Sequence, residues 1–102
     1  MSIVTVYRND TENTIVVSLS KEPIKEKHTG FTYNSKLDPS TVYKKYGLNF
    51  GSECISFWGS VGPDKISAKF NAKNTEIYKL FDNLTKLVPS IKREDLESLL
   101  KC

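Results

Sequence analysis

The chain contains two pairs of short segments in which apolar and polar residues alternate, a pattern typical of half-buried β-strands. The first pair covers residues 3–8 and 14–20, on either side of residues 9–13, and the second covers residues 54–59 and 65–71, on either side of residues 60–64. The intervening segments are rich in Asn, Asp, Gly and Pro, which favour turns. Each pair is therefore predicted to form a β-hairpin.

Strand alternation assigns one apolar face to each predicted hairpin. The core-facing residues are Val4, Val6, Ile15, Val17 and Leu19 in the first hairpin, and Ile55, Phe57, Ile66, Ala68 and Phe70 in the second. Because an isolated hairpin is only marginally stable in water, we expect the two hairpins to lie side by side in one four-stranded sheet.

A helical pattern follows the second hairpin. Between residues 75 and 88 the apolar residues recur at spacings that place them on one side of a helix: Ile77, Leu80, Phe81, Leu84 and Leu87. Asn74 is predicted to cap this helix, Pro89 to end it, and Ser90 to cap a second short helix. The apolar side of the first helix is expected to cover the apolar face of the sheet.

Two stretches of the chain recur about fifty residues apart. FTYNSKLDPS at residues 31–40 returns as FDNLTKLVPS at residues 81–90, and the apolar and polar order of residues 4–19 returns in residues 55–70. Because both matches lie at nearly the same offset, they favour an internal duplication over chance.

The duplication predicts an α+β fold. Two similar ββα motifs, related by a pseudo-two-fold axis, would form one antiparallel sheet with the helices on one face. The chain is interpreted as a single domain, residues 1–102, made of two repeats, residues 1–51 and 52–102.

The first repeat keeps the helical pattern less well. Gly30 and Asn34 stand where the second repeat has leucines, so residues 23–36 are compatible with a short helix, a loop or a partial strand. Farther along, Ser40 is expected to cap one or two helical turns that end at Gly47.

Composition and charge are those of an ordinary globular domain, with 38% hydrophobic and 26% charged residues in a chain of 102. The net charge of +3 is spread over both halves, whereas a dedicated nucleic-acid binder usually concentrates its basic residues on one surface. Neither a membrane-spanning apolar run nor a signal peptide is recognisable. We therefore expect an intracellular protein that does not bind membranes.

Few residues offer catalytic or metal-binding chemistry. His28 is the only histidine and lies among lysines, with no nucleophile identified beside it, which favours a solvated side chain over a catalytic base. The two cysteines, Cys54 and Cys102, form neither a zinc-ligand cluster nor a disulfide framework. The sequence therefore predicts a non-enzymatic protein without a catalytic residue, metal ion or cofactor.

Aromatic residues indicate where a partner would bind, since Tyr and Trp often carry binding energy at interfaces. The weak helical pattern of the first repeat is expected to leave part of the second helix uncovered, in a groove between the repeats. The residues predicted to contact a protein or peptide partner, or a second copy of the chain, are Phe31, Tyr33, Tyr43, Tyr46, Phe81 and Leu84. The alternative is that these side chains close the core themselves.

Nucleic-acid binding is the alternative function. Tyr7 and Trp58 occupy equivalent positions on the strand face turned away from the predicted core. Aromatic rings beside lysines suit single-stranded nucleic acid. The candidate residues for this function are Tyr7, Trp58, Lys44, Lys45 and Lys69.

The chain as a whole resembles a family of small proteins from archaeal filamentous viruses, such as those of Acidianus. The resemblance rests on the length, on the Lys, Tyr, Ile and Asn content, and on halves linked by KLDPS and KLVPS. It implies a viral accessory protein acting in the host cytoplasm and assigns no functional residue.

Overall fold

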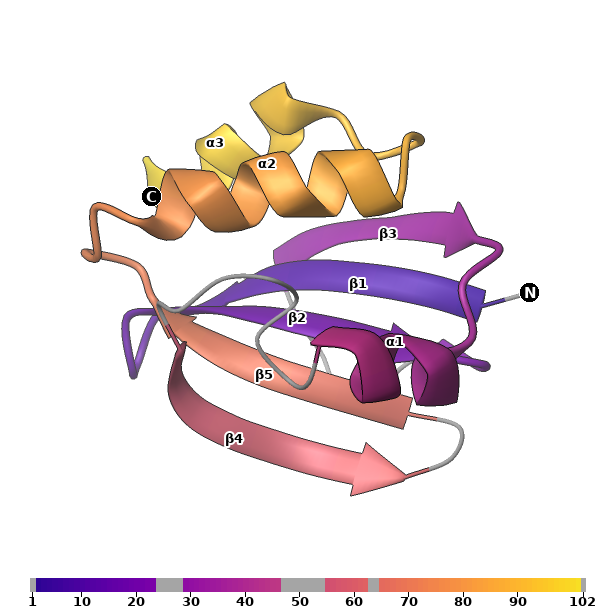
Figure 1. Cartoon of the computed structure of the whole chain (residues 1–102). Coiled ribbons are helices and arrows are strands. Elements are labelled where there is room, and N and C mark those ends of the chain that lie inside the picture. Colours follow the sequence, from indigo (N-terminus) through magenta and orange to yellow (C-terminus); the bar gives the residue numbers. More distant parts are fainter. Residues whose placement is uncertain (1, 24–28, 47–54, 63–64, 102) are drawn as a thin grey trace.

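The computed structural model describes residues 2–23, 29–46, 55–62 and 65–101, and at residues 29, 43, 46 and 55–62 it describes the backbone alone. The described residues form five strands and three helices (Figure 1). In chain order these are β1 (Ser2–Asn9), β2 (Thr14–Ser20), β3 (Thr29–Ser35), α1 (Pro39–Tyr46), β4 (Ile55–Gly62), β5 (Lys65–Asn71), α2 (Ile77–Leu87) and α3 (Arg93–Leu100).

The five strands make one antiparallel sheet with the order β3-β1-β2-β5-β4. The predicted α+β class with an antiparallel sheet is thus confirmed. The sheet is larger than expected because β3 adds a strand beside β1. In this strand Phe31 lies opposite Val6 and Tyr33 lies opposite Val4, so its two aromatic side chains extend the apolar face of the sheet.

The two predicted hairpins lie side by side through β2 and β5. Val17 is opposite Ala68, with Ile15 opposite Phe70 and Leu19 opposite Ile66. Val17 and Ala68 hold matching positions in the two hairpins, so a two-fold axis through this pair would exchange β2 and β5. The pairing register of β2 and β5 is therefore symmetric about this pair.

The second hairpin departs from this symmetry in β4. Ile55 pairs with Phe70 in the register expected from the first hairpin, but the register shifts before Phe57 and again before Val61. The strand continues to Gly62, so the predicted turn at residues 60–64 begins too early. Extra residues of this kind are typical of β-bulges on edge strands, where they interrupt regular pairing.

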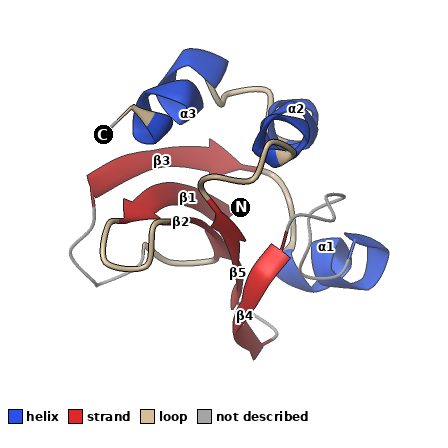
Figure 2. Cartoon of the chain, turned by 90° about the vertical axis from the view of Figure 1, so that its left-hand side faces the viewer, coloured by secondary structure: helices blue, strands red, loops and turns tan. Residues whose placement is uncertain are grey.

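The core lies on one face of the sheet, and all three helices contribute to it (Figure 2). The fully buried side chains of the strands include Val6, Ile15, Val17, Ile66 and Phe70, and those of the helices include Ile77, Leu80, Phe81, Leu84 and Leu96. Helix α1 adds Val42. The predicted apolar side of the helix around residues 77–87 is confirmed, because alternating strand residues and every third or fourth helix residue meet in one cluster.

Each helix starts at a different place from the prediction. Helix α1 begins at Pro39, and the carboxylate of Asp38, not Ser40, accepts hydrogen bonds from Thr41 N (3.2 Å) and Thr41 Oγ1 (3.0 Å). The Asp38-Pro39 pair suits a helix start, since Asp caps free N–H groups and Pro lacks one. The expected end at Gly47 lies outside the described residues.

Helix α1 thus begins earlier than expected, whereas helices α2 and α3 begin later. The side chain of Asn74 accepts a hydrogen bond from Glu76 N (2.8 Å), and helix α2 starts after this turn, at Ile77. Ser90 caps no helix, because its hydroxyl donates to the carbonyl oxygen of Asn34 in the other half of the chain (3.1 Å). Helix α3 accordingly begins at Arg93, without a side-chain cap.

The recurring decapeptides adopt different structures. Residues 31–40 form the second half of β3, a short link and the start of α1, whereas residues 81–90 form most of α2 and the turn after it. The first decapeptide lacks the leucine that Leu84 supplies in the second, and its Thr and Tyr residues favour a strand. The two decapeptides therefore share a sequence pattern but adopt different secondary structures.

Candidate functional site

The C-terminal ends of β3 and α2 lie near each other (Figure 1). A groove of about 490 Å³ is lined by residues at these two ends. Its walls are Asn34, Ser35, Lys36 and Leu37 on one side, and Leu87, Val88, Pro89 and Ser90 on the other. Each wall belongs to one of the two recurring decapeptides, so the groove lies between the two halves of the chain.

The first wall is shaped by the end of β3. Ser35 is the last residue of the strand, and its hydroxyl accepts a hydrogen bond from Leu37 N (2.9 Å). This bond turns the chain toward Asp38 and α1 in the manner of a serine turn. Leu37 is left half-buried against the core, with Lys36 exposed beside it.

The second wall is shaped by the end of α2. Val88 N donates to Leu84 O (2.8 Å) and Ile91 N donates to Val88 O (3.0 Å), which closes a tight turn after the helix. Val88 and Ile91 are buried and hold this turn on the core. Pro89 has no N–H to satisfy and is exposed.

The two walls are joined directly by the hydrogen bond from Ser90 Oγ to Asn34 O. The lining is mostly apolar, from Leu37, Leu87, Val88 and Pro89. Within the described part of the chain, the side-chain amide of Asn34 makes no hydrogen bond. This amide can both donate to and accept from a bound molecule.

Two of the six side chains predicted to contact a partner are not accessible. Phe81 and Leu84 are 0% and 1% exposed, so the uncovered helix face expected from the sequence is absent at these positions. Phe31 is half-buried and packs against the same core. The alternative interpretation, that such side chains close the core, holds for Phe81 and Leu84. The side chains of Tyr43 and Tyr46 lie outside the described residues.

Tyr33 links the sheet to the last helix. It is half-buried, and its hydroxyl donates a hydrogen bond to Asp95 Oδ2 of α3 (3.0 Å). Burial, and then the hydrogen bond to Asp95 and the negative charge of that carboxylate, raise the pKa of the Tyr33 hydroxyl above its ordinary value. The hydroxyl therefore serves as a donor that joins two elements of the fold.

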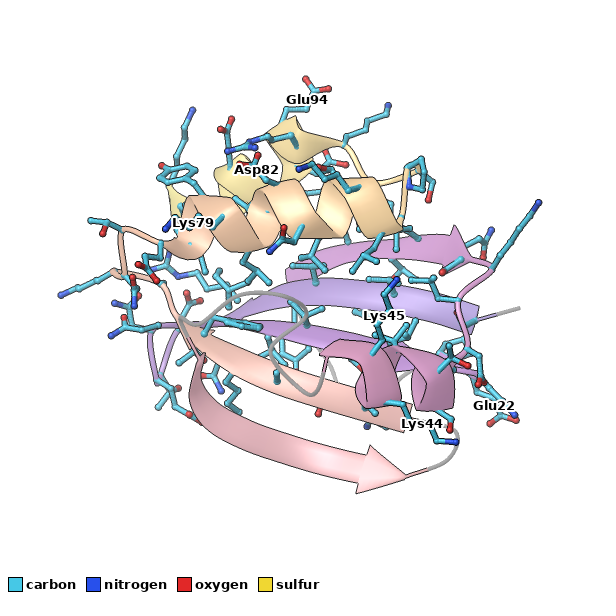
Figure 3. All side chains as sticks on the ribbon, viewed as in Figure 1. Glu22, Lys44, Lys45, Lys79, Asp82 and Glu94 are labelled. Atoms are coloured by element: carbon cyan, nitrogen blue, oxygen red, sulfur yellow. The ribbon has the colours of Figure 1, made fainter. Side chains whose placement is uncertain are left out.

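The residues of the nucleic-acid alternative do not gather on one surface. Tyr7 and Lys69 lie on the sheet face away from the helices, in line with Val16 between them, and Lys69 pairs with Glu12 at 2.8 Å. Lys44 and Lys45 are exposed on α1, which packs on the opposite face (Figure 3). The side chain of Trp58 lies outside the described residues.

A groove between the two repeats was predicted from the sequence, but none of the six residues predicted to contact a partner lines the groove that the structure shows. The recurrence of the decapeptides could have indicated the lining residues, since both walls lie within them. The prediction relied on aromatic residues instead, which lie at neighbouring positions. Among the described residues no cluster of His, Cys, Asp and Glu could hold a metal ion, and no helix is long and apolar enough to cross a membrane.

Comparisons of the chain with protein-family models, with curated proteins and with solved structures found no match.

Proposed function

We propose that this chain is a non-enzymatic interaction protein that binds an extended segment of a partner protein in the groove between residues 34–37 and 87–90. In the setting that its resemblance to viral proteins implies, it would be an accessory protein in the host cytoplasm. The observation that carries the proposal is the groove itself, with its mainly apolar lining at the junction of the two halves.

The size and lining of the groove suit a short peptide. A volume of about 490 Å³ lies within the usual range of ligand sites, roughly 300–1,000 Å³. Apolar walls can take two or three side chains, while the free amide of Asn34 can pair with a peptide backbone. Since Ser90 already holds the two walls together, little ordering is needed on binding.

The internal duplication forms part of this proposal. We infer that the two hairpins descend from one duplicated unit, because Val17 and Ala68 face each other as a two-fold axis requires. The following segments then diverged into β3 and α2, and their divergence supports a groove whose two walls differ in shape. Such a groove suits a partner segment with a defined direction.

Selection of peptides from a random displayed library, with the immobilised chain as target, tests the proposal. Selected peptides should bind the wild-type chain and lose about tenfold or more of their affinity for the double variant Leu37→Ser/Leu87→Ser, because the apolar contacts are removed. Tyr78→Ser is the matched control, since Tyr78 is 47% exposed on α2 and lies outside the groove.

Thermal unfolding of each variant shows that the fold is retained before binding is compared. The proposal is overturned when selection yields no specific peptide. It is also overturned when the selected peptides bind the double variant as tightly as the wild-type chain.

A further inference from the structure

We infer that the groove selects partner segments in which apolar residues are flanked by acidic ones. This inference rests on the proposed function and adds the chemistry of the partner. It starts from the charges around the two walls. Lys36 lines the groove, Lys86 directly precedes the second wall in sequence, and Lys92 follows that wall after Ile91; all three lysines are exposed.

The acidic residues that the structure describes do not neutralise these three lysines. Among the described residues none of them takes part in an ion pair. The only acidic residue within the segments 34–38 and 86–92 is Asp38, and its carboxylate accepts both hydrogen bonds from Thr41. The residues that line the groove or border its walls in sequence therefore carry three lysines and one carboxylate, while the lining itself is mainly apolar.

The C-terminal end of helix α2 opposes the effect of the lysines on an acidic ligand. A helix C-terminus carries a partial negative charge of about half a unit, which by itself disfavours an acidic ligand. Lys86 lies in the last turn of α2 and offsets this charge, and Lys36, which lines the groove, adds a full positive charge. The balance favours a ligand with negative side chains at its ends.

The lining favours a peptide over a nucleic acid with the same charge. Proteins bind single-stranded nucleic acids with aromatic rings on which the bases stack and with arginines that make bidentate contacts to the phosphates. The walls of this groove contain neither, and their apolar side chains are aliphatic or proline. Such walls suit aliphatic side chains of an extended peptide, with lysines to bind its carboxylates.

The test uses three synthetic fluorescent peptides with one shared core, Val-Pro-Leu-Val, flanked on both sides by two Asp, two Ser or two Lys residues. Fluorescence anisotropy should give the tightest binding for the Asp-flanked peptide, about tenfold over the Ser-flanked one, and the weakest for the Lys-flanked one. This preference should shrink between about 50 and 300 mM salt, because exposed charges are screened.

Two charge reversals locate the effect. Lys36→Glu should weaken the Asp-flanked peptide by about fivefold and strengthen the Lys-flanked one. Lys73→Glu is the matched control, since Lys73 is also exposed but lies in the turn between β5 and α2, at the other end of that helix (Figure 1). It should change neither affinity by more than about twofold.

The possible failures are distinguishable. Equal binding of all three peptides, lost in Leu37→Ser/Leu87→Ser, overturns the acidic preference and leaves the proposed peptide groove intact. Tighter binding of a 12-nucleotide single strand that displaces the Asp-flanked peptide also overturns the inference, in favour of nucleic acid. Binding of none of the peptides, or equal binding to the double variant, overturns the inference; when library selection also fails, the proposed function is overturned with it.

Discussion

Gly30 shows how a single residue lets β3 join the sheet. A Cβ atom at this position would overlap the carbonyl oxygen of Val6 and lie 2.5 Å from Cβ of Tyr7. Both atoms belong to β1, with which β3 pairs. Only a residue without a side chain allows the two strands to approach this closely.

Gly30→Ala is therefore expected to destabilise the fold by about 2 kcal/mol, since overpacking against backbone typically costs about 1–3 kcal/mol. Urea unfolding followed by circular dichroism measures the loss. Thr32→Ala, at an exposed position of the same strand, is the control and should cost less than about 1 kcal/mol. Equal effects of the two substitutions would show that the close approach at Gly30 is unimportant.

Tyr33→Phe isolates the hydroxyl that joins β3 to α3. At pH 7 the variant should lose about 1 kcal/mol of unfolding free energy, the usual worth of one hydrogen bond. The folded-state pKa of Tyr33 is raised above the unfolded value of about 10. The stabilising contribution is therefore complete below pH 10 and is lost progressively as the pH rises above it.

Unfolding of both proteins by urea at pH 7 and at pH 10.5 measures this dependence. The wild-type chain should lose more stability on the change to pH 10.5 than Tyr33→Phe does, because only the wild-type chain has this hydroxyl to ionise in the unfolded state. A constant difference between the two proteins across this range would contradict the assignment.

At the scale of elements, Arg8 ties the first hairpin to the last helix. Its guanidinium donates from Nη1 to Leu99 O (2.8 Å) and from Nη2 to Asn13 Oδ1 (2.7 Å). Its Nε lies 3.0 Å from Asp10 Oδ1, an ion pair that is not aligned as a hydrogen bond. One side chain thus holds strand β1, the turn after it and the C-terminal end of α3, where a positive charge is favourable.

Arg8→Met keeps the apolar stem and removes these contacts. It should cost about 2 kcal/mol, because hydrogen bonds to charged groups are worth about 1.5–3 kcal/mol and the carbonyl of Leu99 loses its partner. Arg8→Lys should recover only part of this loss, because lysine keeps the positive charge but lacks the several N–H donors of the planar guanidinium. Chemical denaturation of the three proteins gives the order, and identical stabilities of the Arg8→Met variant and the wild-type chain would refute the role.

At the scale of the whole molecule, the C-terminal segment from Ile91 to Leu100 covers part of the core that the first hairpin contributes. Ile91, Leu96 and Leu99 are 5%, 0% and 3% exposed. Burial of three such side chains contributes about 5–8 kcal/mol, which is comparable to the total stability of about 5–15 kcal/mol expected for a domain of this size. The two ends of the chain therefore depend on each other for stability.

A chain that ends at Ser90 should lose cooperative unfolding and most of its native circular dichroism at 25 °C. A chain that ends at Leu100 is the control and should unfold like the full protein, since Lys101 is exposed. A sharp thermal transition in the shorter chain would show that the hairpins and α2 form a stable unit without α3.

The sequence by itself determined the hairpins and α2. Alternation over 14–20 and 65–71 and the spacing from Ile77 to Leu87 are local, periodic signals, and one buried face is enough to fix each element. The offset of the two hairpins assigns matching places to Val17 and Ala68, and these two residues lie opposite each other in β2 and β5. Local signals also located the turn at residues 9–13.

Only the tertiary structure decided which secondary structure each recurring decapeptide adopts and where the groove lies. Residues 31–35 form a strand because Phe31 and Tyr33 lie opposite Val6 and Val4 of β1. In the second decapeptide, the leucines of α2 pack on the core as a helix. In that arrangement the hydroxyl of Ser90 donates a hydrogen bond to Asn34 O and does not cap a helix. Such contacts join residues far apart in the sequence, so their energies depend on the assembled fold and leave no periodic trace in the sequence.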